Sequence, residues 1–382
     1  MRLTVENLGP VVSADIAFAD LTLLVGPQAT GKSLFLQTLK LAFDFPVIKK
    51  ELKRFGFVWN SVSPGLIELV YGEGTASVWN AATRVTLNDK VVDLGRNPKN
   101  ASKEERIFYI PAQRVMTLKS GWPRPFTDYE SGDPYALKHF SEQLRLMMET
   151  GLGQGSGEEG SNVFPHSRRI KSQLKQAIED SVYQAGNIKV DADRRKRLML
   201  KVGDSNLPFM TWSAGQREFL PLLLGMYYLL PPGKHTKRTD VDLVVIEEPE
   251  MGLHPKAIQA FMLLVFELIS RDYKVAISTH SPVLLELAWV LAAMREAKAG
   301  PDELLQLFQL KPSAAVRAIF EKVITARVGV HSFSRAADGS VRSRDISSLD
   351  AGAADEATAD WGGLTSFASR ASDIVSSLMS QI

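Results

Sequence analysis

Residues 26–33 read Gly-Pro-Gln-Ala-Thr-Gly-Lys-Ser, a glycine-bounded turn that ends in Gly-Lys-Ser. The apolar run 21–25 before this turn fits a buried strand, and the leucine-rich segment after it fits a helix. Glycines in such a strand-loop-helix unit let the backbone curl until successive N–H groups face one phosphate. The segment therefore predicts a phosphate-binding loop (P-loop) in an α/β fold, with a nucleoside triphosphate and Mg²⁺ as its ligands.

The motif predicts different roles for the lysine and the serine at the end of the loop. Its lysine would reach the β- and γ-phosphates of ATP and assist catalysis, and the serine that follows would hold Mg²⁺. The helix that begins here adds the positive end of its dipole. The candidate nucleotide-binding residues are Gly26, Pro27, Gln28, Ala29, Thr30, Gly31, Lys32 and Ser33.

The composition narrows the class of protein. The chain has 382 residues, 45% of them hydrophobic, enough for one large α/β domain or a domain with an insertion. It has no cysteine, which excludes disulfides and cysteine metal sites. A net charge of +2 is too small to indicate nucleic-acid binding by itself. Without a signal peptide or a long apolar stretch, the sequence predicts a cytoplasmic protein that does not enter the membrane.

The first third of the chain predicts mostly strands. Three strands are expected at 3–8, 12–18 and 21–25, and alternation across 66–94 predicts an antiparallel meander. The buried strand 107–110 follows. Residues 121–205 open with a proline-rich turn and predict a mainly helical lobe inserted in the core, with helices at about 134–150 and 167–186 and the glycine-rich loop 151–160 between them.

The last part of the chain alternates again between strands and helices. Strands at 243–246 and 275–278 and helices at 255–270 and 282–294 predict a parallel sheet with right-handed crossovers. A hairpin that turns at Asp338-Gly339 is expected across 328–346, followed by a loop at 347–360. The chain divides into an N-terminal core lobe (1–120), the inserted lobe (121–205), a C-terminal core lobe (206–300) and C-terminal helices, hairpin and tail (301–382).

Two adjacent carboxylates follow the apolar strand 243–246. Glu247 and Glu248 would stand at the carboxyl end of a buried strand, where parallel sheets bind ligands. Phosphoryl transfer needs such a pair, because Glu247 can orient the Mg²⁺ shell while Glu248 polarises the attacking water. The alternative is an acidic loop after a strand.

Two further motifs are ambiguous alone. Ser213-Ala214-Gly215-Gln216 opens an apolar helix, where Ser213 fits an ordinary N-cap. His280 ends the strand 275–278, where a histidine is usually a structural polar residue.

The order and spacing of these four motifs resemble the ATP-binding-cassette (ABC) ATPase superfamily. This resemblance implies an α/β fold with a mixed-sheet ATPase core, an antiparallel β subdomain and an inserted helical lobe. It implies that Ser213, Gly215 and Gln216 form the signature of one subunit, which closes over the γ-phosphate held by the P-loop of another. It also makes His280 the switch histidine that contacts the γ-phosphate. Gln113 matches the glutamine that senses Mg²⁺ and water, although Gln113 also fits a plain turn residue and Arg114 is an alternative.

Finer features resemble the ATPase domain of overcoming-lysogenization-defect (OLD) proteins, relatives of RecF, Rad50 and SMC ATPases. These are the run 247–255, the His280-Ser281-Pro282 ending and the opening 7–10, and the similarity covers about 1–115 and 205–300. Glu247 replaces the commoner aspartate of this branch, and Gln28 replaces its usual asparagine. OLD nucleases add a TOPRIM domain with an Asp-x-Asp pair. No such pair follows His280, and the pairs at 191–193 and 240–242 are expected at the surface.

The resemblance implies an ATPase that dimerises around two ATP molecules with Mg²⁺. Its partners would be a second copy or a higher homo-oligomer, a separate nuclease or toxin as effector, and duplex DNA, within a bacterial anti-phage or toxin–antitoxin-like system. Basic runs that could contact DNA, or simply form solvated faces, lie at 49–54, 168–171 and 194–197. Two alternatives stay open: the nucleotide-binding subunit of a membrane transporter, and a scaffold that uses ATP as a static assembly ligand.

Overall fold

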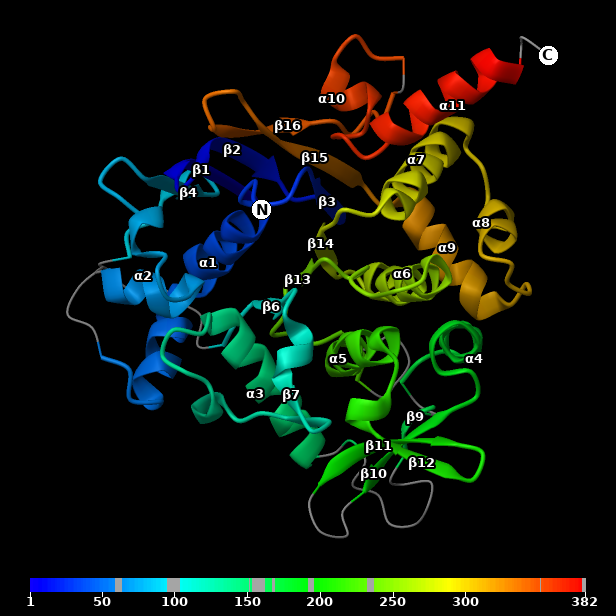
Figure 1. Cartoon of the computed structure of the whole chain (residues 1–382), viewed down its shortest axis with the longest axis horizontal. Coiled ribbons are helices and arrows are strands. Elements are labelled where there is room, and N and C mark those ends of the chain that lie inside the picture. Colours follow the sequence, from blue (N-terminus) through cyan, green and yellow to red (C-terminus); the bar gives the residue numbers. More distant parts are fainter. Residues whose placement is uncertain are drawn as a thin grey trace.

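A ten-stranded mixed sheet forms the centre of the molecule (Figure 1). The computed structural model describes residues 1–58, 64–94, 104–150, 152, 162–166, 169–191, 196–231, 237–350 and 352–379. The strands of this sheet are β1 (Arg2–Leu8), β2 (Val11–Ala17), β3 (Leu21–Val25), β4 (Arg84–Leu87), β5 (Lys90–Val91), β6 (Ile107–Ile110), β13 (Leu243–Glu247), β14 (Lys274–Ser278), β15 (Val328–Arg335) and β16 (Val341–Asp345). Their order is β5-β4-β1-β2-β16-β15-β3-β14-β13-β6.

The sheet has a parallel part and an antiparallel part. Strands β15, β3, β14, β13 and β6 run parallel to one another, whereas β2, β1, β4 and β5 pair antiparallel. The three strands expected in residues 1–25 and the hairpin expected across 328–346 are confirmed. The sequence did not indicate that this hairpin lies between β2 and β3, where it joins the two parts of the sheet.

Helices cover both faces of the parallel strands. One face packs against α1 (Lys32–Arg54), with Leu24 and Val245 in the same cluster as Phe35 and Leu39. On the other face, Leu23 and Val244 pack in the cluster that contains α3 (Tyr135–Thr150), α5 (Ala214–Leu229), α6 (Pro255–Ser270), α7 (Pro282–Ala297) and α9 (Ala314–Thr325). Adjacent strand residues therefore serve opposite layers, as the period of two requires. Among the described helices, none is both long and apolar enough to cross a membrane.

The lobe at 121–205, expected to be mainly helical, contains a sheet as well as helices. The helix at 134–150 exists as α3, and the second helical pattern shrinks to α4 (Ser172–Ile178) and a π-helical turn at Glu179–Tyr183. A four-stranded antiparallel sheet accompanies them, with the order β12-β11-β10-β9, formed by β9 (Asn162–Phe164), β10 (Asn187–Asp191), β11 (Arg197–Val202) and β12 (Ser205–Pro208). Buried Leu198 and Leu200 alternate with more exposed neighbours, which is a strand pattern. The glycine-rich loop 151–160 lies outside the described residues, except for Leu152.

The meander expected across 66–94 is wrong in its first half. Residues Pro64–Tyr71 form helix α2, and Ala76–Val78 form a single 3₁₀ turn; β4 and β5 follow as expected. The short apolar run 66–71 fits both the period of a helix and that of a strand. Packing against α1 favours the helix, because Leu66 and Val70 lie in one hydrophobic cluster with Leu41. The loop at 347–360 contains the short helix α10 (Glu356–Ala359). The remaining helices are α8 (Asp302–Leu307) and α11 (Ser366–Met379).

A buried ionic network ties α1 to β6. Lys40 of α1 forms ion pairs with Asp44, at 2.9 Å, and with Glu105, and its ammonium also donates to the carbonyl of Ile107. Asp44 in turn accepts hydrogen bonds from the backbone N–H groups of Arg106 (2.9 Å) and Ile107 (3.0 Å). Burial of these charges is tolerable because each has several partners.

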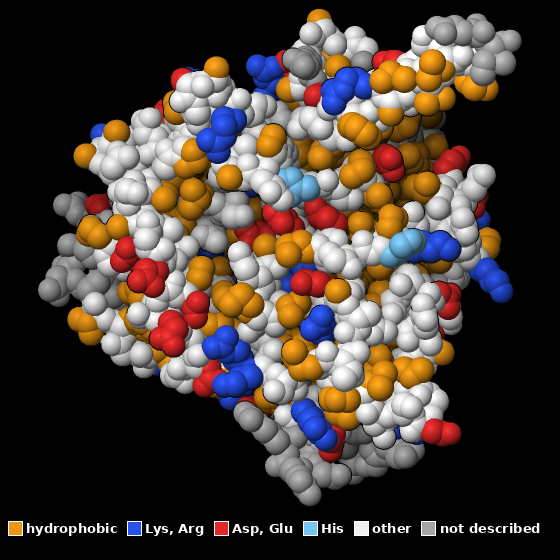
Figure 2. All heavy atoms as spheres, viewed as in Figure 1, with side chains coloured by type: hydrophobic (Ala, Val, Ile, Leu, Met, Phe, Trp, Pro, Cys, Tyr) orange, Lys and Arg blue, Asp and Glu red, His pale blue; other side chains and the backbone are white. Residues whose placement is uncertain are grey.

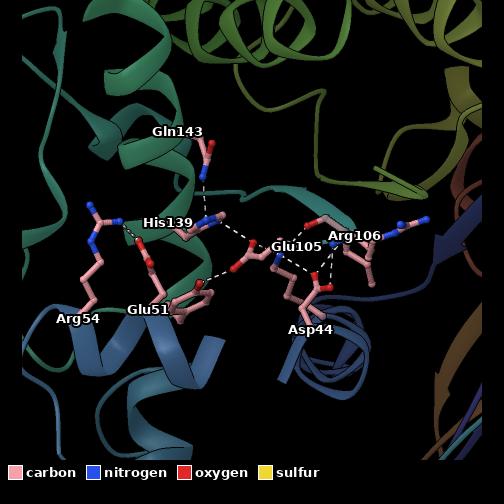
Figure 3. A network of polar contacts seen from close by, with 10 residues as sticks. Asp44, Glu51, Arg54, Glu105, Arg106, His139 and Gln143 are labelled. Carbon is pink, nitrogen blue, oxygen red and sulfur yellow. Dashed lines mark hydrogen bonds and ion pairs between the residues drawn. The ribbon is translucent and has the colours of Figure 1, made fainter. Parts of the chain in front are cut away.

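The same network continues to α3 (Figure 3). His139 Nδ1 lies 3.0 Å from Glu105 Oε2, Gln143 Nε2 lies 3.0 Å from His139 Nε2, and Tyr135 donates to Glu105. An amide donor on Nε2 fixes the neutral tautomer that carries its proton on Nδ1. Burial lowers the pKa of His139 to about 4, against the opposing effect of Glu105. The P-loop helix, the strand β6 and the inserted lobe thus share one polar core.

We predict that His139 makes stability depend on pH in a defined window. Its pKa is about 4 in the folded protein and about 6.5 when unfolded, so below pH 6.5 the unfolded chain binds the extra proton. The stabilisation is present above pH 6.5 and is lost as the pH falls towards 4, with a ceiling of about 3 kcal/mol. Urea denaturation at pH 5 and pH 7 measures the free energy of unfolding. That free energy should fall from pH 7 to pH 5 in the wild type and fall less in His139→Gln. Equal decreases in the two proteins would contradict the assignment.

The C-terminal hairpin supports the loop at the start of α1. Gly26 has φ +130°, and a Cβ there would lie 2.3 Å from the carbonyl oxygen of Phe333 in β15. A backbone oxygen cannot yield as a flexible side chain would, so the loop can approach β15 this closely only with glycine.

We predict that Gly26→Ala lowers the free energy of unfolding by about 3 kcal/mol, because it adds steric overlap to a strained φ. Gly74→Ala is the matched control, since Gly74 also has positive φ (+81°) but would place its Cβ in open space. The control should lose about 1 kcal/mol. Urea denaturation of both variants measures the difference, and equal losses would show that the contact with β15 is unimportant.

Candidate functional site

The loop 26–33 has the curled backbone that its sequence predicts. Ala29 and Gly31 have positive φ (57° and 83°), and Gly31 directly precedes the first residue of α1. The hydroxyl of Thr30 donates to the carbonyl of Pro27 (2.8 Å) and closes the turn. Arg335 of β15 donates to the carbonyl of Ala29 and adds a cation at the rim of the loop. Sequence reasoning missed Arg335, because nothing in the pattern placed the hairpin beside the loop.

Lys32 folds back over its own loop. Its ammonium donates to the carbonyls of Gly26 (2.8 Å) and Pro27 (2.9 Å), and the side chain is buried. Burial lowers the pKa of Lys32 to about 8, although Glu248 and Glu250 favour the charged form. The lysine is thus held as a cation at neutral pH in the place where the motif predicts contact with phosphate oxygens.

Glu247 ends β13 in a fully buried position. Its Oε2 accepts a hydrogen bond from the backbone N–H of Ala112 (3.2 Å), whereas its Oε1 is buried without a hydrogen-bond partner among the described residues. Burial raises the pKa of Glu247, and the neighbouring hydroxyls of Ser33 and Tyr109 oppose that rise. A buried carboxylate oxygen without a donor, beside the serine of the P-loop, fits a hard cation such as Mg²⁺. Glu247 and Ser33 are therefore compatible with the metal role that the sequence predicts.

Glu248 and His280 face each other. His280 Nε2 lies 3.4 Å from Glu248 Oε1, and this contact, followed by the charges of Lys32 and Arg114, lowers the pKa of Glu248 against the effect of burial. Glu248 is therefore ionised at neutral pH and can accept a proton or orient a water molecule. Figure 2 shows acidic side chains and a histidine gathered near the centre of the face viewed.

Glu250 is a functional carboxylate to which sequence reasoning gave no role. Its Oε1 accepts from the hydroxyl of Thr279 (2.8 Å) and from the backbone N–H of His280. It therefore fixes the backbone that presents the histidine. The only available signal was its place in the run Glu247-Glu248-Pro249-Glu250.

The parallel register brings these residues together. Leu24 of β3 and Glu247 of β13 both pair with Ser278 of β14, so the three strands end side by side. The backbone N–H of Thr279 continues this pairing to the carbonyl of Leu24 (2.9 Å). Lys32, Glu247, Glu248 and His280, predicted from separate motifs, thus converge at the carboxyl edge of the sheet, where α/β proteins bind ligands.

The signature segment lies at the start of α5. Ser213 caps α5 in a capping box with Gln216, as predicted: its Oγ accepts from the N–H of Gln216 (3.3 Å), and its own N–H donates to Gln216 Oε1 (3.0 Å). Gly215 packs closely on the segment after Glu250, because a Cβ there would lie 3.1 Å from the carbonyl of Gly252. Ser213 is exposed, and α5 packs on the face of the sheet opposite α1. No hydrogen bond joins Ser213, Gly215 or Gln216 to the P-loop in the described part of the chain.

Gln113 precedes the 3₁₀ helix η2 (Arg114–Thr117) with an exposed side chain, so its proposed role towards Mg²⁺ stays a prediction. The neighbouring Arg114, the alternative raised by the sequence, is fully buried and donates to the carbonyls of Glu247 and Glu248, each at 3.1 Å. Arginine side chains are seldom buried. No sequence pattern predicts that this guanidinium donates its hydrogen bonds to backbone carbonyls.

The Asp-x-Asp pairs lie outside this site. Asp191 pairs with Arg197 (2.9 Å), Asp240 with Arg238 and Asp242 with Arg106 (both 2.6 Å); Asp193 lies outside the described residues. Within the described ranges, no three His, Asp or Glu side chains are grouped to hold a metal ion. The expectation that both pairs lie at the surface fits Asp191, Asp240 and Asp242, which are partly exposed.

Comparisons with known proteins agree with the motifs. Residues 158–286 match the family described as "AAA domain, putative AbiEii toxin, Type IV TA system", which is less than half of the chain. No curated protein matches the chain.

Several solved structures show distant similarity. The SMC head domain from Thermotoga maritima has 12% identity and a TM-score of 0.37, with 90% of this chain and 97% of that chain covered. The SMC head bound to the C-winged helix domain of ScpA has 10% identity and a TM-score of 0.42, with 90% and 96% covered. The dimeric bacterial ABC transporter cassette MJ0796 has 11% identity and a TM-score of 0.34, with 73% and 88% covered. The finer resemblance to OLD proteins stays a prediction. The four motifs, three of which the mixed sheet brings together, fit a P-loop ATPase of the ABC/SMC type, and residues 158–286 are similar to the AAA-domain family.

Proposed function

We propose that the chain is a Mg²⁺-dependent ATPase that dimerises around two ATP molecules and uses their binding and hydrolysis to control an effector. The observation that carries this proposal is the convergence of Lys32, Glu247, Glu248 and His280 at the ends of three adjacent strands. A phosphate loop alone supports binding. A loop beside an ionised carboxylate, held by a histidine, supports attack by water on the bound phosphate.

Each residue has a chemical task in this proposal. The N–H groups of the loop and Lys32 would bind the phosphate oxygens, and Lys32 would leave the carbonyls of Gly26 and Pro27 to do so. Ser33 and Glu247 would hold Mg²⁺, which neutralises charge on the phosphates when bound. Glu248 would orient the attacking water and accept its proton, and His280 would position Glu248 and contact the terminal phosphate.

A second copy would complete the site. Ser213 is exposed at the start of α5, and α5 and the P-loop helix α1 pack on opposite faces of one sheet. An exposed signature that makes no hydrogen bond with the P-loop of its own chain, within the described residues, can reach a bound nucleotide on another copy. This supports ATP-dependent association, with the homodimer as the smallest assembly.

The matching family supports a toxin–antitoxin-like role, because its description names a putative toxin of a toxin–antitoxin system. A separate nuclease or toxin as the effector, acting in the cytoplasm against phage, is the finer part of this proposal. Duplex DNA stays a second candidate partner: Lys50 and Lys53 are exposed, whereas three other basic residues expected to contact DNA form ion pairs within the chain. Arg54 pairs with Glu51, Lys171 with Glu267 and Arg197 with Asp191. Arg168, Arg194 and Arg195 lie outside the described residues.

Two other functions would use the same site. A nucleotide-binding subunit of a transporter needs a small subdomain that couples to membrane helices, whereas residues 121–205 form a larger lobe with its own sheet. A scaffold with ATP as a static ligand would not need an ionised Glu248 beside His280. Turnover and association measurements distinguish both from the switch proposed here.

We predict that Glu248→Gln lowers ATP turnover by a factor of about 10²–10⁴ while ATP still binds, because the amide keeps the shape but cannot accept the proton. The variant should accumulate as an ATP-bound dimer. Phosphate release and light scattering after size exclusion, with and without ATP, measure the two effects.

Ser213→Arg is the complementary variant for association. It should bind ATP as a monomer and hydrolyse it slowly, because a bulky cation at an exposed helix start blocks the second copy. Ser205→Arg is the control, since Ser205 is also exposed but belongs to β12. If ATP never changes the oligomeric state of the wild type, the composite site is wrong; turnover unaffected by Glu248→Gln would refute the catalytic assignment.

A further inference from the structure

Arg114 places a fully buried guanidinium behind the catalytic carboxylates. Its Nη1 donates to the carbonyls of Glu247 and Glu248 (both 3.1 Å), and its Nη2 donates to the carbonyl of Pro249 (3.4 Å). Its Nε donates to the carbonyl of Glu218 (3.2 Å), and the Glu218 carboxylate lies 3.3 Å from Nη2. The five N–H donors of an arginine in a fixed plane can hold several acceptors in one geometry.

The three consecutive carbonyls bracket a strained residue. Glu248 has φ +42°, in the left-handed region that residues with a Cβ seldom occupy. Such a conformation persists only where its surroundings impose it, and it is typical of functional sites. Its N–H donates to the carbonyl of Ser278 (2.9 Å), while Arg114 holds the carbonyls on both sides of the residue. Arg114 therefore holds the backbone of the strained residue through the carbonyls of Glu247 and Glu248.

The other end of Arg114 reaches the signature helix. Glu218 lies in the first part of α5, which Ser213 caps, and a Cβ on Gly252 would lie 3.1 Å from Glu218 Cγ. Gly215, in the first turn of the same helix, approaches the carbonyl of Gly252. The start of α5 and the segment 247–252 are thus packed together, with Arg114 bonded to both.

We propose that Arg114 is a positioning residue that holds Glu248 in its left-handed conformation and links that conformation to the signature helix. The inference rests on the proposed function, because it assigns Arg114 to the reaction in which Glu248 is the base. It goes beyond that function because the orientation of the Glu248 carboxylate would depend on α5, the helix that a second copy would contact. Movement of α5 on association would then be transmitted to Glu248 through Arg114 and Glu218.

The test separates ATP binding from turnover in Arg114→Lys and Arg114→Met. Neither variant changes the P-loop, so the Kd for ATP should stay within about threefold. The kcat should fall by about 10²-fold for Arg114→Met, because a small misplacement of a reacting group has that cost. Arg114→Lys should recover part of the loss, since an ammonium can hold some of the carbonyls but lacks the planar fork.

A double variant decides whether Arg114 acts through Glu248. In a Glu248→Gln background, Arg114→Met should change the single-turnover rate by less than about threefold, because the group it positions is already gone. Lys138→Met is the matched control: Lys138 is also fully buried and bonds two backbone carbonyls, those of Glu130 and Ser131, away from the site. It should lower thermal stability and leave kcat unchanged.

Wild-type kcat in Arg114→Met, or an equal loss with and without Glu248, would overturn the inference. If both Arg114 variants fail to fold, Glu218→Gln decides, because it removes the ion pair and keeps the carbonyl bond. It should lower kcat about fivefold with Kd unchanged, and an unchanged kcat would again overturn the inference.

Failure of the proposed function gives a different result. In that case the wild type shows no turnover that depends on Glu248. Hydrogen exchange then tests the positioning alone. The N–H groups of Glu248 and Met251, bonded to Ser278 and Glu248, should exchange faster in Arg114→Lys than in the wild type, while the P-loop stays unchanged. Equal exchange in segment 247–252 would refute the inference without reference to ATP.

Discussion

The parallel pairing of β3, β14 and β13 is the constraint on which the site depends. Strands that run in one direction end at one edge, and their register places Leu24, Ser278 and Glu247 side by side. The loop after β3, the carboxylates after β13 and the histidine after β14 meet for this reason, although more than 240 residues separate the first from the last. A shift of one residue in the pairing of one strand would turn the side chains of that strand to the other face of the sheet and displace the segment that follows it.

Buried cations then fix the parts that the sheet leaves free. Lys40 and its acidic partners join α1 to β6, and Arg114 joins η2 to the segment after β13 and to α5. Each charge is stable in the interior because several acceptors replace its water, and removal of one partner would leave the others unpaired. The two networks therefore act as rigid couplings between elements whose hydrophobic contacts alone would allow small movements.

The sequence indicated which side chains meet at the candidate site better than it indicated which residues hold the backbone around them. Lys32, Glu247, Glu248 and His280 follow strands with strong apolar patterns, so their meeting point could be inferred. Glu250 and Arg335 act through backbone carbonyls and N–H groups, which leave no side-chain pattern to recognise. Arg114 was raised only as an alternative to Gln113, and its bonds to backbone carbonyls had no sequence signal. The same limit applies to the fold. The short apolar run 66–71 fits both the helical and the strand period, and packing against α1 selects the helix. In the inserted lobe, the helical patterns at 134–150 and 167–186 hid the alternation that β11 carries at Leu198 and Leu200.

The opposite placement of α1 and α5 gives ATP its proposed control over association. If the P-loop and the signature lay on one face, a single copy could close its own site and ATP would bind without consequence for assembly. Here α5 and α1 pack on opposite faces of the sheet, so in the proposed function the exposed Ser213 would complete a site on another copy. The helix that would make this contact is bonded through Glu218 to the arginine that holds Glu248. Association and the orientation of the Glu248 carboxylate are therefore expected to change together. An isolated copy would then hydrolyse ATP slowly, and the rate of hydrolysis would rise when the copies associate.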